Sequence, residues 1–287
     1  MPEMNDSDLQ GNYPITLHHI AYYAVRVPDN IAVIDQGKAF SYAVFYRDIC
    51  KMIIALRVFK FEPGQSVVIE FLPVHTQLGS FYLHRVTLLA MEASGVATMS
   101  YIEDEAWCLK EIPETLDWVM TFSGKAPLNA EKTHVMDKKW LKLVMNMQLR
   151  TSFAQADISA RSHCRILKSS GTTGKMKYMF RSFENQDFIY NNAQFRGGFI
   201  RQSRYFVTMG FNVSAIQAAV TTCIHAGETC VYDTRINAAD ALSKYEIKHV
   251  SFLLHGLMQV LDSLPEDYVK PTNLRLLTIG SAVSEAV

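Results

Sequence analysis

Apolar residues recur at three- and four-residue steps along one segment near the start of the chain. That period predicts a long amphipathic helix with one buried face. Ser41 precedes the helix and is expected to cap it, because a serine hydroxyl accepts an otherwise unpaired amide hydrogen of the first turn. Pro63-Gly64 ends the pattern. The apolar positions of this helix are Tyr42, Phe45, Tyr46, Ile49, Met52, Ile53, Leu56 and Phe59.

Short runs of β-branched and aromatic residues predict strands, and helical patterns separate most of them. Gln36-Gly37-Lys38 is expected to turn the chain into a hairpin, and Gly95 suits the left-handed cap of a helix over 78–89. Strands are expected at 31–34, 67–72, 96–99, 118–122, 205–209, 228–232, 249–252 and 274–279, and further helices at 103–111, 214–226, 238–244 and 256–264.

Strands that alternate with helices predict an α/β fold with mostly parallel sheets flanked by helices, because a parallel pair requires a crossover connection. The polar stretch 148–163 is the best candidate for a linker between two layered α/β halves. We therefore expect a first subdomain over residues 1–155 and a second over residues 156–287.

Charge and composition exclude several classes of protein. The chain carries 28 basic and 28 acidic residues, which argues against a nucleic-acid binder. No apolar run is long enough to span a membrane, and the acidic start is unlike a secretory signal. The 5 cysteines form no Cys-x-x-Cys pair, which argues against a disulfide framework or a zinc site. We expect a cytoplasmic protein with reduced thiols and no metal-ligating residues.

The segment 165–181 stands apart from the rest of the chain because it contains basic residues and no acid. Hydroxyl residues and glycines follow one another without interruption from Ser169 to Gly174. Glycines let the backbone approach a ligand closely, and successive amides, hydroxyls and lysines can converge on an anion. The segment therefore predicts a polyphosphate site, and a solvated polar loop is the alternative.

A Walker-type phosphate loop does not fit this segment. Only two residues separate Gly171 from Gly174, where the Walker pattern needs four, and Met176 rather than a hydroxyl residue follows Lys175. Thr172 and Thr173 can equally stabilise a turn through bonds from side chain to backbone.

The run Ser-Ser-Gly-Thr-Thr-Gly-Lys-Met-Lys at 169–177 resembles the phosphate-binding signature of the adenylate-forming superfamily. This superfamily comprises acyl-CoA synthetases, luciferases and the adenylation domains of peptide synthetases. Met176 and Tyr178 replace the usual proline and glycine, while Lys177 keeps the position of the family's lysine. Further segments are similar to the family in order and spacing: 27–34 with 40–42, 62–73, 209–212 and 273–284.

The resemblance implies ATP-dependent activation of a carboxylic acid, with ATP and Mg²⁺ as cofactors. The acid would form an acyl-adenylate, and CoA or an acyl- or peptidyl-carrier protein would then take the acyl group as a thioester. The adenine site would be Gly280, Ser281 and Ala282, and Phe211 with Asn212 would border the acyl pocket, although Phe211 suits a plain core position equally well. The implied phosphate-binding residues are Ser169, Ser170, Gly171, Thr172, Thr173, Gly174 and Lys177.

In the family, further motifs, a hinge and a mobile C-terminal domain with a catalytic lysine follow the segment at 273–284. The resemblance therefore implies an N-terminal portion that is insufficient for turnover, with a second subdomain that is incomplete at its C-terminus. The alternative is a non-catalytic scaffold or partner protein with the same fold. Met176, Tyr178 and Asn212 favour that alternative, because they depart from the family's usual residues.

Overall fold

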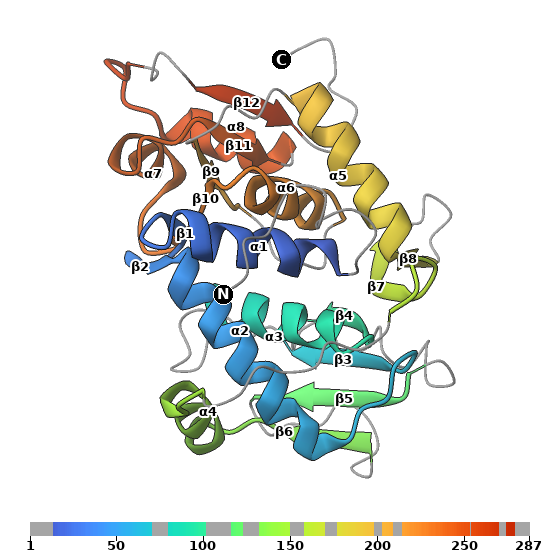
Figure 1. Ribbon diagram of the computed structural model, residues 1–287. Helices are drawn as coiled ribbons and strands as arrows, with labels where there is room; N and C mark the ends of the chain where they lie inside the picture. The colour runs from blue at the N-terminus through green and yellow to red at the C-terminus, as the bar shows by residue number, and fades with distance from the viewer. Residues whose placement is uncertain are drawn as a thin grey trace.

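Two sheets organise the chain (Figure 1). The computed structural model describes residues 14–70, 80–101, 116–122, 132–149, 158–169, 177–197, 203–208, 214–252, 254–269 and 274–278. Within these residues each sheet has six strands, and we name them sheet A and sheet B. The predicted α/β class with mostly parallel sheets is confirmed, since each sheet contains only one antiparallel pair.

Sheet A has the order β12-β11-β9-β10-β1-β2. Its strands are parallel except for the hairpin between β1 and β2, whose turn places Gln36 and Gly37 at φ 50° and 78°. The turn therefore has the left-handed backbone expected for a tight hairpin. The bounds are β1 Ile31–Asp35, β2 Lys38–Ser41, β9 Arg204–Phe206, β10 Thr229–Tyr232, β11 His249–Phe252 and β12 Arg275–Thr278.

Sheet B has the order β6-β5-β3-β4-β7-β8. It is parallel except for the pair β7 and β8. Neither β6 nor the β7–β8 pair was expected from the sequence. The bounds are β3 Ser66–Glu70, β4 Ala97–Tyr101, β5 Trp118–Thr121, β6 Thr133–Val135, β7 His163–Ser169 and β8 Lys177–Ser182.

Sheet membership crosses the expected division at residues 155 and 156. β1 and β2 from the first part of the chain pair with β10 from the second, and β7 from the second part pairs with β4 from the first. Strand pairing is non-local, so a polar stretch between two α/β segments does not have to separate two sheets. The division at 155 and 156 therefore does not coincide with the boundary between sheet A and sheet B.

Most of the expected helices are present. The α2 helix begins after Ser41, whose hydroxyl accepts from the Val44 amide at 3.4 Å, and Gly95 has φ 74° after α3. The helix expected at 103–111 lies outside the described residues, and α1, α4 and α5 were not expected. The bounds are α1 Ile15–Arg26, α2 Tyr42–Leu56, η2 Arg57–Phe59, α3 Phe81–Ala93, α4 Lys138–Asn146, α5 Phe183–Gly197, α6 Ser214–His225, α7 Ala238–Lys244 and α8 Leu254–Ser263.

The largest hydrophobic core lies between the sheets. It unites Val33 and Tyr205 of sheet A, Ile69 and Met120 of sheet B, and the inner faces of α1, α2, α3 and α6 (Figure 1). On the other face of sheet A, a second cluster packs Phe206 and its neighbours against α7 and α8. Within the described residues, helices therefore cover both faces of sheet A, which directs attention to the ends of its strands as the place for a ligand.

Candidate functional site

The carboxyl ends of the strands define one edge of sheet A. Strands β1, β10, β9, β11 and β12 are parallel, so they all end at this edge. From β9 the chain crosses to β10 on one side and then to β11 on the other. Such a reversal of strand order opens a crevice at the carboxyl edge of open α/β sheets, where ligands bind.

Two of the predicted site segments follow strands that end at this edge. Phe211 and Asn212 come after β9, and Gly280, Ser281 and Ala282 come after β12. All five residues lie outside the described residues, so the roles predicted for them stay predictions. The topology nevertheless brings the chain to one edge of one sheet immediately before each segment.

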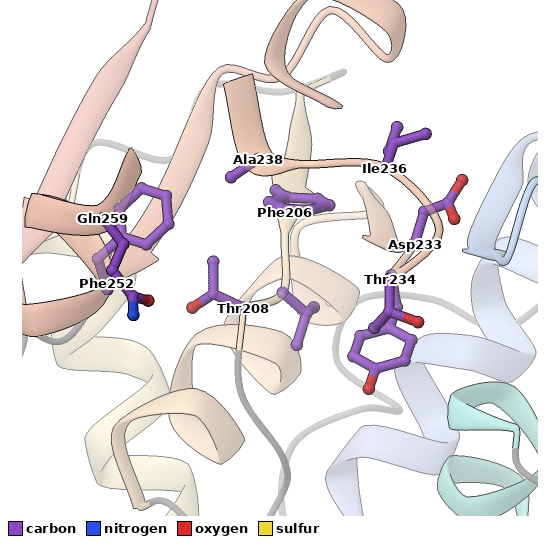
Figure 2. A pocket seen from close by; sticks show the side chains of 11 residues that line it. Phe206, Thr208, Asp233, Thr234, Ile236, Ala238, Phe252 and Gln259 are labelled. Atoms are coloured by element: carbon purple, nitrogen blue, oxygen red, sulfur yellow. The ribbon is translucent and has the colours of Figure 1, made fainter. Parts of the chain in front are cut away.

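A cleft of about 410 Å³ lies at this edge, beside β9, β10 and β11 (Figure 2). Phe206 and Phe252 come from strands, and Gly256 comes from the first turns of α8. Most of the lining groups are apolar, and hydroxyl and amide groups of threonine and glutamine supply the polar atoms. The lining residues are Phe206, Val207, Thr208, Tyr232, Asp233, Thr234, Ile236, Ala238, Phe252, Gly256 and Gln259.

Asp233 is the only charged residue among the described residues that line the cleft. Its carboxylate accepts hydrogen bonds from the Arg235 guanidinium at 2.8 Å and from the Tyr245 hydroxyl at 2.6 Å, and Lys244 lies 3.7 Å away. The bonds from Arg235 hold the pKa of Asp233 well below its usual range. Figure 2 shows the carboxylate turned away from Phe206, so it does not offer a free anion to the cleft.

The predicted phosphate-binding segment connects β7 and β8. Ser169 and Lys177 are opposite each other in the antiparallel ladder, so the two ends of the segment meet at the edge of sheet B. Residues 170–176, and the side chains of Ser169 and Lys177, lie outside what the structure describes. The backbone therefore places the signature between two paired strands, and the predicted roles of Ser170, Gly171, Thr172, Thr173 and Gly174 stay predictions.

A hydrogen bond joins this hairpin to the segment that contains the predicted acyl residues. The Arg181 guanidinium of β8 donates to the Ser214 hydroxyl, the first residue of α6, at 2.7 Å. Lys177 is four residues before Arg181, about 13 Å along an extended strand. Asn212 is two residues before Ser214. The bond therefore joins β8 of sheet B to the first residue of α6, the helix that follows β9 of sheet A along the chain.

Arg165, a basic residue of β7 that precedes the predicted phosphate-binding segment, has a structural environment that the sequence did not reveal. Arg165 is completely buried in β7 and donates to the Thr98 and Ser100 hydroxyls of β4, at 2.8 and 2.6 Å. Burial lowers the pKa of Arg165 to about 10, so the guanidinium remains charged at neutral pH. Arg165 belongs to the basic stretch 165–181, and in the structure its guanidinium links β7 to β4.

Arg85 is a second fully buried cation, and it was expected only as one position on a buried helix face. It donates from α3 to Gln217 and Thr221 of α6, at 3.2 and 2.9 Å. These bonds fix the helix that follows the predicted acyl segment. The sequence contained one indication of this contact, an arginine at an otherwise apolar helical position. Such an arginine indicates polar partners, because buried arginines occur with them.

Within the described part of the chain, no three His, Cys, Asp or Glu side chains cluster closely enough to hold a metal ion. Among the same residues, no helix combines the length and the apolar character that crossing a bilayer requires.

No protein-family model matches the sequence, and no curated protein sequence does either. Solved structures do match. The chain superposes on o-succinylbenzoate CoA synthetase from Bacillus subtilis in complex with ATP and magnesium ion. The TM-score is 0.74 at 18% identity, and the match covers 91% of this chain and 54% of that one. It therefore spans about half the length of that enzyme.

Two further solved structures also superpose on most of this chain. The complex of the Bacillus subtilis synthetase with its acyl-adenylate intermediate gives a TM-score of 0.72 at 16% identity, over 92% of this chain and 68% of that one. The N-terminal domain of FACL13 from Mycobacterium tuberculosis gives 0.79 at 14% identity, over 94% and 71%. The chain therefore has the fold of the N-terminal portion of adenylate-forming enzymes.

Proposed function

We propose that the chain contributes the ATP- and acid-binding portion of an adenylate-forming ligase. In the reaction, a carboxylate oxygen attacks the α-phosphorus of ATP, the bond to the β-phosphate oxygen breaks, and pyrophosphate leaves. A thiol of CoA or of a carrier protein then displaces AMP from the acyl-adenylate and forms a thioester. Two of the similar structures are complexes, one with ATP and magnesium ion and one with an acyl-adenylate intermediate.

One observation carries this proposal. The signature at 169–177 begins and ends on paired strands of sheet B, and Arg181 of the same hairpin bonds to Ser214 just beyond the predicted acyl segment. This bond ties the hairpin that carries the predicted phosphate segment to the helix that follows the predicted acyl segment, which supports the proposal. Positioning of the acid against the α-phosphate is the main contribution that a protein makes to such a step.

The proposed roles follow the predicted segments. Ser169, Ser170, Thr172, Thr173 and Lys177, with the amides of Gly171 and Gly174, would hold the β- and γ-phosphates. Gly280, Ser281 and Ala282 would pack on adenine, and Phe211 with Asn212 would border the acid. Mg²⁺ would arrive with ATP and neutralise phosphate charge, since it usually keeps phosphate and water ligands. A cytoplasmic location would supply both ATP and the thiol.

A non-catalytic scaffold is the second candidate. Met176 and Tyr178 replace the residues that usually make the phosphate segment mobile, and Tyr178 packs against buried residues of sheet B. A scaffold would retain the fold without binding the nucleotide at this segment.

Calorimetric titration with ATP and Mg²⁺ tests the proposal. We expect saturable binding that Lys177→Ala weakens at least about tenfold, because a charge-assisted bond to phosphate is lost. Lys175→Ala is the matched control, since it removes the same charge two residues away. Equal weakening by both variants would indicate a general charge effect, and absence of binding to the wild-type chain would favour the scaffold.

A further inference from the structure

The cleft at the carboxyl edge of sheet A has a composition that restricts its ligand. Phe206 and Phe252 project from the same face of the sheet, and Ile236 and Ala238 lie beside them (Figure 2). Thr208 donates its hydroxyl hydrogen to the Ser251 carbonyl, so that donor is already used. The cleft therefore presents aromatic and aliphatic surface with few free polar groups.

Electrostatics restrict the ligand further. A ligand ammonium needs a carboxylate or several acceptors to replace the water it loses. Asp233 is the one carboxylate in the described lining, and it is 2% exposed and bonded to Arg235 and Tyr245. Burial raises the pKa of Tyr232 to about 12, so this second lining residue stays neutral. Among the described residues, the lining of the cleft thus provides no free counterion for an ammonium group.

On the basis of the proposed function, we propose that this cleft holds the organic group of the acid and selects compact aromatic carboxylic acids without an α-amino group. A volume of about 410 Å³ lies within the usual range for a small-molecule pocket, and an aromatic ring can pack against Phe206 and Phe252. The acid carboxylate would face the edge of the sheet, towards the nucleotide.

Gly256 determines how deep the cleft is. It lies inside α8, and a Cβ atom built on it would have only Phe252 Cδ1 within 4 Å, at 3.9 Å. A larger side chain at this position would therefore extend into the cleft without a clash with the backbone. Glycine inside a helix is less favourable than most other residues. Gly256→Leu should consequently make the fold more stable while it fills the ligand space.

The test compares two ligands that differ by one ammonium group, 3-phenylpropanoate and L-phenylalanine, by calorimetric titration of the full chain. We expect 3-phenylpropanoate to bind at least about tenfold more tightly than phenylalanine, because the ammonium loses hydration without a partner. Gly256→Leu should weaken binding of 3-phenylpropanoate at least about tenfold while the melting temperature rises. Asp262→Leu, on the exposed side of the same helix, is the matched control and should leave binding unchanged.

Each outcome separates this inference from the proposed function. Equal binding of both ligands, or unchanged binding by a stable Gly256→Leu variant, would overturn the cleft assignment. If ATP binds in a separate titration but neither acid does, the inference fails and the proposed function stands. If 3-phenylpropanoate binds as expected and ATP does not, the cleft assignment stands and the activation reaction fails.

Discussion

Glu228 is a buried carboxyl group whose ionisation should oppose folding. It lies just before β10 and is 1% exposed. Burial raises the pKa of Glu228 from its usual 4.5 to about 7, although Ser203 and Lys248 partly offset that rise. Since each pKa unit corresponds to about 1.4 kcal/mol, the difference amounts to at most about 3 kcal/mol.

The direction of the pH dependence follows from the linkage between proton binding and folding. An acid with a raised pKa in the folded state binds its proton more tightly there, so the folded protein is favoured at low pH. This stability is present in full below pH 4.5 and is lost as the pH rises towards about 7. We therefore expect Glu228→Gln to increase the free energy of unfolding by up to about 3 kcal/mol at pH 8.5. At pH 4 the change should be small, because both side chains are then neutral.

Urea unfolding, followed by circular dichroism at pH 4, 6, 7 and 8.5, measures this difference. The value at pH 4 reports how well the amide fits the site, and the rise above that value reports the cost of the charge. Glu266→Gln, at an exposed position, is the matched control and should show little pH dependence. A Glu228→Gln effect that is independent of pH, or that becomes more destabilising as the pH rises, would refute the argument.

Two further substitutions test local features by urea unfolding. Gly227→Ala should lower the free energy of unfolding by about 2 kcal/mol, because Gly227 has φ 73° and the new methyl group would lie 2.7 Å from the Tyr23 ring. Gly64→Ala, at φ 89° with nothing within 4 Å, should cost only about 1 kcal/mol, and equal losses would contradict the clash. Asp137→Ala should cost about 1 kcal/mol, because its carboxylate caps α4 at the Trp140 amide, 2.7 Å away; Asp267→Ala should be neutral.

Local patterns predicted the helices and strands whose apolar residues recur at a regular spacing. The apolar period of α2, the serine before it and the glycine after α3 all have the expected structure. The α5 helix was missed because its residues are mostly polar, and only Phe183, Gln186 and Tyr190 are described as buried. The strand β6 is too short to show a regular alternation of apolar and polar residues. A helix or strand without a regular apolar face gives little local indication.

The candidate site also combines features that a local pattern predicts with features that only folding produces. The order of hydroxyl residues and glycines at 169–177 predicts a phosphate-binding segment, because that chemistry depends on neighbouring residues. The cleft did not emerge from the sequence, since Phe206 and Phe252 are far apart along the chain and meet only because β9 pairs with β11. The environment of Arg165 was not evident from the sequence for the same reason, because its hydroxyl partners lie on β4.

The sequence by itself determined the α/β class and most helices, and it predicted the phosphate-binding segment, because hydrophobic period and local residue chemistry act over a few neighbouring positions. Only the tertiary structure decided which strands share a sheet, which arginines are buried and where the cleft opens. A strand's side-chain pattern specifies the face that it buries but not the strand beside it. Distant segments form the site only when folding pairs them.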